Sequence, residues 1–157
     1  MRNTLHFFKR QEVKKIIDKV LNDSQTILSP ISITTSESLN DDFTTTDFSF
    51  EQKGSDPKIV SIVDQKGKGF IDGLFTGLYD HYQPIFDSLS EVKLLDLSVN
   101  PISSLSKTSI GTDAQASVLF SVYVKNHGAA EFQHQSRSMI YSSFVLALET
   151  FEFYINC

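Results

Sequence analysis

Residues 64–75, DQKGKGFIDGLF, join a short apolar strand to a helix and hold three of the chain's seven glycines. The preceding segment KIVSIVD, residues 58–64, has the length and the β-branched content of a strand. After the glycines, apolar residues recur on one helical face as far as Tyr82, and Pro84 lies at or beyond the helix end. This stripe consists of Phe70, Ile71, Leu74, Phe75, Leu78, Tyr79 and Tyr82. A strand that passes through glycines into an amphipathic helix therefore stands at the centre of the expected fold.

Two further strands are predicted upstream of this junction. In ILSPISITTS, residues 27–36, Pro30 indicates an edge strand or a bend, because proline cannot donate to a sheet ladder. In FTTTDFSFEQ, residues 43–52, the residues Thr44, Thr46, Phe48 and Phe50 alternate with Thr45, Asp47 and Ser49. Polar turns at residues 38–43 and 53–57 separate the segments. The first half of the chain thus has the order strand, strand, strand, helix.

The second half repeats this order. VKLLDLSV, residues 92–99, predicts a strand, and a loop rich in Ser, Thr, Pro and Gly follows at residues 100–113. In residues 114–125 one strand face carries Ala116, Val118, Phe120, Val122 and Val124. The NHG sequence predicts a hairpin with a positive φ angle at Gly128, and residues 129–135 form the return strand. Residues 136–156 predict the second helix, with Ser136 or Ser138 as its N-cap and with a stripe of Ile140, Phe144, Ala147, Leu148 and Phe151.

The expected fold class is α+β. A leading helix over residues 9–21 has its apolar face at Val13, Ile16, Ile17, Val20 and Leu21. It belongs to a leading helix and linker segment, residues 1–26, which precedes two βββα units at about residues 27–90 and 91–157. One such unit cannot cover its sheet alone, so we expect the two units to pack together as a pseudo-twofold repeat.

Composition narrows the classes of function. A chain of 157 residues with a formal net charge of −5 fits one globular domain and argues against nucleic-acid binding, which depends on clustered Lys and Arg. Its basic doublets, Lys9-Arg10 and Lys14-Lys15, fit the solvated face of the leading helix. The only cysteine, Cys157, excludes an internal disulfide and suits a reducing compartment. No apolar run of about 18 residues exists to span a membrane, and the apolar patch within residues 1–10 is too short for a signal peptide. We therefore expect a cytoplasmic protein, or one that is processed in an organelle.

Four interpretations of the glycine stretch remain open. A phosphate-binding P-loop lacks its lysine and hydroxyl spacing, and a dinucleotide fingerprint would need Gly73 one place earlier. A plain turn is the third. In the fourth, the glycines bare backbone N–H groups at the helix N-terminus, where the partial positive charge favours an anion. A carboxylate beside apolar residues would satisfy that site, and such a ligand is an amino acid.

The titratable residues predict neither a catalytic nor a metal site. His127 and His134 lie around a hairpin, and no cluster of His and Cys has the spacing of metal ligands. Asp113 is expected to bond its own loop backbone rather than to act as an acid or base. No serine lies in a G-x-S-x-G elbow.

Three stretches together resemble the carboxy-terminal regulatory domain of 2-isopropylmalate synthases. GKGFIDGLF, residues 67–75, looks like that domain's G-x-G-P-x-D-A segment. LLDLSVNPI and IGTDAQASVLFSV, residues 94–102 and 110–122, look like its L-x-D-Y and G-x-D-A-x-A stretches. SRSMIYSSFVLALETFEFYIN, residues 136–156, is similar to its closing helix.

The resemblance implies a homodimer of paired βββα units that binds the pathway's end product, leucine, between subunits for feedback inhibition in branched-chain amino-acid biosynthesis. In the related citramalate synthases the same domain binds isoleucine. The effector site carried over from the family consists of Gly67, Lys68, Gly69, Ile71 and Asp72, the pocket residues Leu94, Leu97 and Pro101, and Ala114, Ala116, Ser138 and Met139.

Several positions depart from the family's pattern. Phe70 replaces a proline, Leu97 stands where an aromatic is common, and Pro101 stands where a small residue is common. Arg137 and Tyr141 replace smaller or acidic residues. These changes would reshape the pocket, and they keep open a dimerisation or interaction module that binds no ligand.

The family's catalytic module is a barrel that carries the divalent metal and the acetyl-CoA site. A (β/α)₈ barrel needs about 250 residues, so this chain of 157 residues cannot contain one. We therefore expect no cofactor and no catalysis from this chain alone, and a catalytic barrel as its partner in cis or in trans. A small stand-alone enzyme is a further alternative, which only the near-miss glycine loop supports.

Overall fold

The computed structural model describes residues 4–5, 7–102 and 115–157 and confirms an α+β fold. Its helices are α1 (Phe7–Leu21), α2 (Phe70–Tyr82) and α3 (Met139–Asn156), and short 3₁₀ turns lie at Asn22–Ser24 and Asp87–Leu89. Its strands are β1 (Thr4–Leu5), β2 (Ile27–Glu37), β3 (Thr44–Lys53), β4 (Lys58–Gly67), β5 (Val92–Ile102), β6 (Gln115–Val124) and β7 (Gly128–Ser136).

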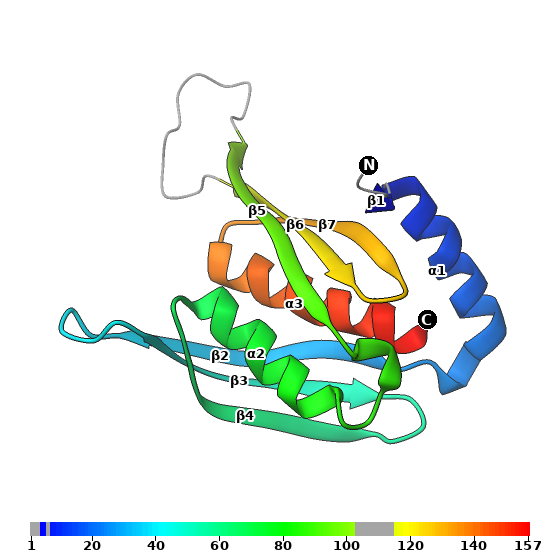
Figure 1. Cartoon of the computed structure of the whole chain (residues 1–157), viewed down its shortest axis with the longest axis horizontal. Coiled ribbons are helices and arrows are strands. Elements are labelled where there is room, and N and C mark those ends of the chain that lie inside the picture. The colour runs from blue at the N-terminus through cyan, green and yellow to red at the C-terminus, as the bar shows by residue number, and fades with distance from the viewer. Residues whose placement is uncertain (1–3, 6, 103–114) are drawn as a thin grey trace.

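The strands form two sheets with α2 and α3 between them, and α1 lies at the side, next to β1 and β7 (Figure 1). One sheet has the antiparallel order β2-β3-β4, and the other has the order β1-β7-β6-β5, in which β1 pairs parallel with β7. Helix α2 packs on β3 and β4, whereas α3 contacts β2 of one sheet and both β6 and β7 of the other. The predicted order of two βββα units is confirmed. The short strand β1 was not predicted.

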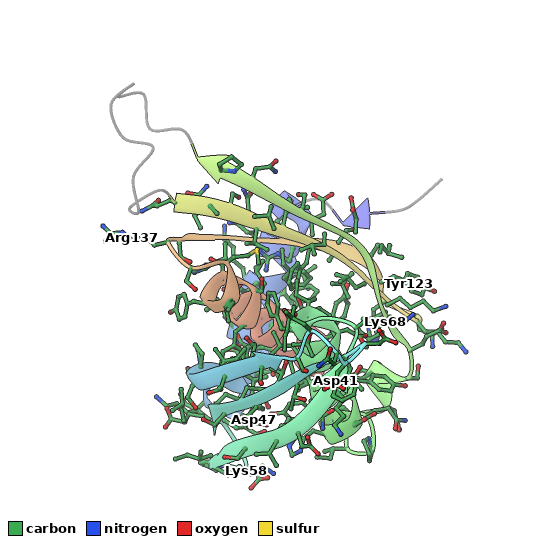
Figure 2. All side chains as sticks on the ribbon, turned by 90° about the vertical axis from the view of Figure 1, so that its left-hand side faces the viewer. Asp41, Asp47, Lys58, Lys68, Tyr123 and Arg137 are labelled. Carbon is green, nitrogen blue, oxygen red and sulfur yellow. The ribbon has the colours of Figure 1, made fainter. Side chains whose placement is uncertain are left out.

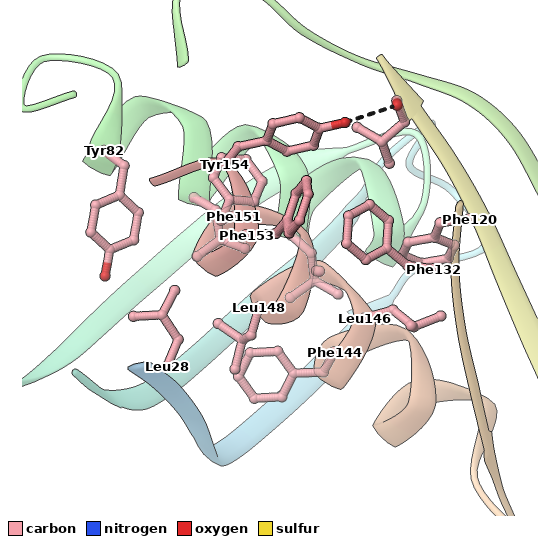
Figure 3. Close-up of a cluster of buried hydrophobic side chains, with 14 of the residues drawn as sticks. Leu28, Tyr82, Phe120, Phe132, Phe144, Leu146, Leu148, Phe151, Phe153 and Tyr154 are labelled. Carbon is pink, nitrogen blue, oxygen red and sulfur yellow. Dashed lines mark hydrogen bonds between the residues drawn. The ribbon is translucent and has the colours of Figure 1, made fainter. Parts of the chain in front are cut away.

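Helix α3 forms the centre of the core (Figure 3). Its Phe144, Leu148 and Phe151 are almost completely buried, as the stripe predicted. Because α3 is covered from both sides, Leu146 and Tyr154 are buried as well. The predicted stripe, which describes only one face of the helix, therefore contains only part of the buried residues of α3. The predicted stripe is wrong at Ile140, which lies in the first turn of α3 and remains 36% exposed.

Local geometry agrees with several sequence signals. Gly128 has a φ of 82° in the hairpin between β6 and β7, as predicted. β2 is an edge strand with an irregular register between Pro30 and Ser32. Helix α2 ends at Tyr82, two residues before Pro84. A methyl group on Gly77 would lie 3.0 Å from the Phe48 ring, so this glycine lets α2 pack closely on the sheet.

Helix α1 lies against β7 and α3. Of its predicted apolar face, Ile17 is buried and Val13 and Leu21 pack against the core, but Ile16 and Val20 are 62% and 73% exposed. The leading helix therefore uses only part of its apolar face in the fold. Within the described residues, no helix has the length and apolar character needed to cross a membrane.

Candidate functional site

The candidate site is built on the junction between β4 and α2. Strand β4 ends at Gly67, and α2 starts after Gly69, which is its N-cap residue. A methyl group on Gly67 would lie 2.7 Å from the backbone nitrogen of Gly73, so the first turn of α2 rests directly on Gly67. Gly69 is different, because a methyl group there would have no atom within 4 Å. Gly67 is therefore required by the fold, and Gly69 faces open space.

The N-terminus of α2 has no side-chain cap at its N-cap position. Asp72, in the first turn, accepts a hydrogen bond of 3.0 Å from the backbone N–H of Lys68. This carboxylate interacts favourably with the positive end of the helix. The first-turn amides of α2 therefore have an acidic neighbour but no hydroxyl or amide cap. The antiparallel pairing of β3 with β4 does not provide the parallel unit on which dinucleotide sites are built.

A groove of about 700 Å³ runs beside α2 and connects this N-terminus with β5. Ile71, Asp72 and Phe75 line it from α2, and Leu94 and Leu97 line it from β5. Four predicted site residues, Ile71, Asp72, Leu94 and Leu97, thus lie around one depression. Their arrangement offers an apolar surface with a carboxylate at one end.

The far end of the groove carries further polar groups. The Tyr79 hydroxyl donates a hydrogen bond of 3.0 Å to the carbonyl of Ser90, which fixes the approach to β5. Glu91 and Lys93, both lining residues, form an ion pair, and the hydrogen bond and charge of Lys93 lower the pKa of Glu91. The groove therefore has acidic groups near both ends of an apolar stretch.

Strand β5 is the edge of its sheet and is long and apolar for such a position. Leu95, Leu97 and Val99 are 39%, 40% and 40% exposed. Exposed apolar edge strands are templates for pairing with another chain. This edge borders the groove, because Leu95 and Leu97 line it.

Gly67, Lys68 and Gly69 lie at the junction itself but do not line the groove, and a second group of predicted residues lies near the start of α3. Ala116 on β6 stands opposite Pro101 on β5 and opposite Ser136 on β7. Ser138 is the N-cap of α3, and Met139, its first residue, is 42% exposed. None of Pro101, Ala116, Ser138 and Met139 lines the groove. The predicted residue Ala114 lies outside the described residues.

Both helices begin at the same end of the sandwich (Figure 1). Figure 2 views the molecule from that end and labels Lys68, just before α2, and Arg137, just before α3. The starts of α2 and α3 therefore share one end of the molecule, although only Ile71, Asp72, Leu94 and Leu97 among the predicted residues line a depression.

Sequence reasoning missed a second cavity of about 220 Å³ between α1 and α3. Arg10 and Lys14 were interpreted as part of a solvated helix face, but both line this cavity, together with Glu149 and Glu152 of α3. The sequence does place Arg10 and Lys14 on one face of α1, and Glu149 and Glu152 on one face of α3, by their spacing of four and three residues. Only the packing of α1 on α3 shows that the two faces meet.

The rest of the described surface offers little for catalysis. Within residues 4–5, 7–102 and 115–157, no group of three or more His, Cys, Asp or Glu side chains is placed to hold a metal ion. The His134 Nδ1 lies 3.0 Å from the Ser142 hydroxyl, but Ser142 is completely buried and closed to a substrate.

The sequence matches no family model, and no curated protein matches it.

Proposed function

We propose that this chain is the effector-binding and dimerising regulatory domain of a 2-isopropylmalate synthase-like acyltransferase. Its effector is a branched-chain amino acid, leucine or isoleucine, which acts as a feedback inhibitor. The observation that supports this most directly is the groove, which joins Ile71 and Asp72 of α2 with Leu94 and Leu97 of β5. The proposal also rests on the sequence resemblance and on the two βββα units.

A branched-chain amino acid has three parts, and the groove has a complementary group for each. Its carboxylate would accept hydrogen bonds from the first-turn amides of α2, where no side chain caps the helix. Its ammonium group would lie near Asp72, and its aliphatic side chain would contact Phe75 and Leu97. The open space at Gly69 allows a ligand to approach the backbone there.

The exposed edge strand supports association of two copies. Burying Leu95, Leu97 and Val99 against a second chain would remove apolar surface from water and would close the groove between subunits. Effector binding between subunits could then alter a catalytic barrel, in cis or in trans, with a coupling energy of about 1–3 kcal/mol. The divalent metal and acetyl-CoA would belong to that barrel, and the setting would be cytoplasmic.

One observation favours a second candidate, a dimerisation module that binds no ligand. Asp72 already places a carboxylate at the N-terminus of α2, where it accepts from the Lys68 amide. An effector carboxylate would have to bind beside this negative charge. In this alternative the groove is filled by the partner chain rather than by a metabolite.

A thermal scan with the twenty amino acids tests the proposal. Leucine, isoleucine or valine should raise Tm, and at about 100 times Kd the added stability is about 2.7 kcal/mol, or roughly 5–10 °C. Gly69→Val should abolish the shift without changing the dimer in size-exclusion chromatography. A dimer that responds to no amino acid at millimolar concentration would establish the ligand-free alternative.

Ala116→Phe separates the two groups of predicted residues. If Ala116 contacts the effector, the added ring should remove the thermal shift. A full response in this variant would show that the effector occupies the groove alone and that the assignment of Ala116 is wrong.

A further inference from the structure

Helix α1 carries an apolar ridge that the fold leaves exposed. Ile16 and Val20 are four residues apart, hence on one helical face, and are 62% and 73% exposed. Lys19 follows Ile16 by three residues and Lys15 precedes Lys19 by four, so two exposed lysines border the apolar pair. Glu12, four residues before Ile16, is the acidic side chain on this face. We call the two apolar residues and the two lysines the α1 ridge.

The charge of α1 contrasts with that of the whole chain. Phe7–Leu21 contain five basic and two acidic residues, a formal charge of +3, whereas the whole chain carries −5. Lys15 and Lys19 repel each other at their spacing of four residues, and neither is in an ion pair within 4 Å among the described residues. An acidic surface placed against the α1 ridge would therefore be attracted by both lysines.

The opposite charge occurs in the hairpin between β2 and β3. Its residues 37–43, ESLNDDF, contain three acidic residues and no basic one, a formal charge of −3. Leu39 is completely exposed. The turn is closed by the Asp41 N–H, which donates a hydrogen bond of 3.1 Å to the carbonyl of Ser38. Across the described part of the chain, neither Asp41 nor Asp42 is in an ion pair within 4 Å. We call residues 37–43 the hairpin tip.

The α1 ridge and the hairpin tip lie at opposite ends of the molecule (Figure 1). One chain therefore cannot bring its own two surfaces into contact. Glu37 accepts a hydrogen bond of 2.8 Å from the Thr44 hydroxyl and is engaged within its own hairpin. Asp41 and Asp42 are thus the acidic groups of the tip that can meet the lysines of another molecule.

Two kinds of surface could complement a basic helix face, an anionic membrane or an acidic protein. A membrane would gain little apolar burial from two aliphatic side chains, and its acidic lipids would repel a chain of net charge −5. The hairpin tip, in contrast, combines acidic side chains with one fully exposed apolar side chain. These observations favour a second copy of the chain as the partner.

We propose that the α1 ridge of one copy binds the hairpin tip of a second copy. Leu39 of the tip contacts Ile16 and Val20, and the two aspartates lie near the two lysines. Because the two surfaces differ and lie at opposite ends, the contact is head-to-tail, and every added copy leaves one surface of each kind free. Both surfaces are small, which places the contact in the weak class that buries less than about 1,200 Å².

Sedimentation velocity of the whole chain at concentrations up to about 1 mM tests this contact, because that range reaches millimolar affinities. The wild type should self-associate, and higher salt should weaken the association by screening exposed charges. Lys19→Glu should weaken it by about tenfold or more. Lys125→Glu is the control, because it makes the same charge change at an exposed lysine outside both surfaces. Equal association of these two variants, or a wild type that remains unassociated, would overturn the proposal.

Leu39→Ser tests the apolar part of the contact from the other surface. Because Leu39 is completely exposed, this change leaves the core intact, and it should also weaken self-association. Unchanged association would show that the tip is not in the contact. A wild type that stays unassociated but sediments with phosphatidylserine vesicles would assign the α1 ridge to a membrane and refute the second copy as its partner.

A charge exchange connects the two surfaces directly. Lys15→Glu/Lys19→Glu and Asp41→Lys/Asp42→Lys should each lose self-association, because like charges then face each other, whereas an equimolar mixture of the two variants should regain it. Circular dichroism checks that both variants are folded. A mixture of folded variants that sediments as its separate components would refute the pairing.

The contact uses neither β5 nor the groove at α2, so it does not rest on the proposed function. If two copies also pair through β5, the wild type grows from dimers and the Lys19→Glu variant stops at the dimer. If they do not, the wild type grows from monomers and the variant stops at the monomer. Failure of the β5 dimer and failure of the head-to-tail contact are therefore distinguishable in one experiment.

Discussion

The two long helices that follow the sheets begin in different ways. At α3 the Ser138 hydroxyl caps the helix by accepting from the Tyr141 amide at 3.1 Å. Ser136 bonds the backbone of Ser138 and the hydroxyl of Ser142, so the polar groups of this start satisfy one another. At α2 the N-cap is Gly69, which supplies no side chain. Two halves with one architecture therefore have one helix start with a side-chain cap and one without.

The two glycines before α2 show the same contrast on a smaller scale. Gly67 is covered by the helix, whereas Gly69 has an extended φ of −164° and free space around it. The sequence alone does not distinguish these two glycines, but only Gly67 is required by the packing of α2.

Gly67→Ala should give the largest effect, because the new methyl group would lie 2.7 Å from the backbone nitrogen of Gly73 and 2.8 Å from the Asp72 carboxylate. We expect a loss of about 2–3 kcal/mol in the free energy of unfolding, measured by urea denaturation. Gly69→Ala is the matched control and should change stability by less than about 0.5 kcal/mol. Similar losses in both variants would show that the two glycines do not differ in role.

The sequence was a good guide to the fold because its signals were local. Alternation in Thr44–Lys53 and the helical stripe ending at Tyr82 each depend on neighbours in the chain, and both are confirmed. The prediction that Ile140 is buried is wrong, because its exposure depends on where the sheets end above α3. The spacing of apolar residues along the helix carries no information about that.

The site was less predictable because it depends on which segments meet. The family pattern grouped Ile71 with Leu94 and Leu97, and the structure does bring these residues to one groove. The same pattern also grouped Pro101 and Ser138 with them, but neither of these two residues lines the groove. The cavity at Arg10 and Glu149 depends on helix packing across the whole length of the chain, so spacing alone could not reveal it.

Exchanging the caps tests the contrast between the helix starts directly. Ser138→Ala removes the hydrogen bond to the Tyr141 amide and should lower stability by about 1 kcal/mol. Gly69→Ser supplies a hydroxyl to α2 and should raise stability by a few tenths of a kcal/mol, roughly the advantage of serine over glycine as a cap. Both changes are measured by urea denaturation. If Gly69→Ser also removes the thermal response to leucine, the free amides of α2 are part of the effector site.

The last turns of α2 and α3 should respond to pH in opposite directions. Burial and the nearby Lys58 lower the pKa of His81 at the end of α2 from its usual 6.5, whereas burial raises the pKa of Glu152 near the end of α3. The folded chain therefore binds fewer protons at His81 than the unfolded chain does, and this part of the stability falls as the pH drops below 6.5. At Glu152 the folded chain binds more protons, so its part is present below the usual pKa of 4.5 and is lost as the pH rises through the raised value.

The effect of His81 is isolated by subtracting the urea stability of His81→Gln from that of the wild type at about pH 7.5 and at about pH 5.5. Glu152 is common to both proteins, so its contribution cancels. The difference should favour the wild type more at the higher pH, because only the wild type has an imidazole to protonate in the partly buried site beside Lys58. Since His81 is only partly buried, this is the smallest of the expected effects. A difference that is constant with pH would mean that His81 is protonated as easily in the folded chain as in the unfolded one, and that the end of α2 is as open to solvent as its start.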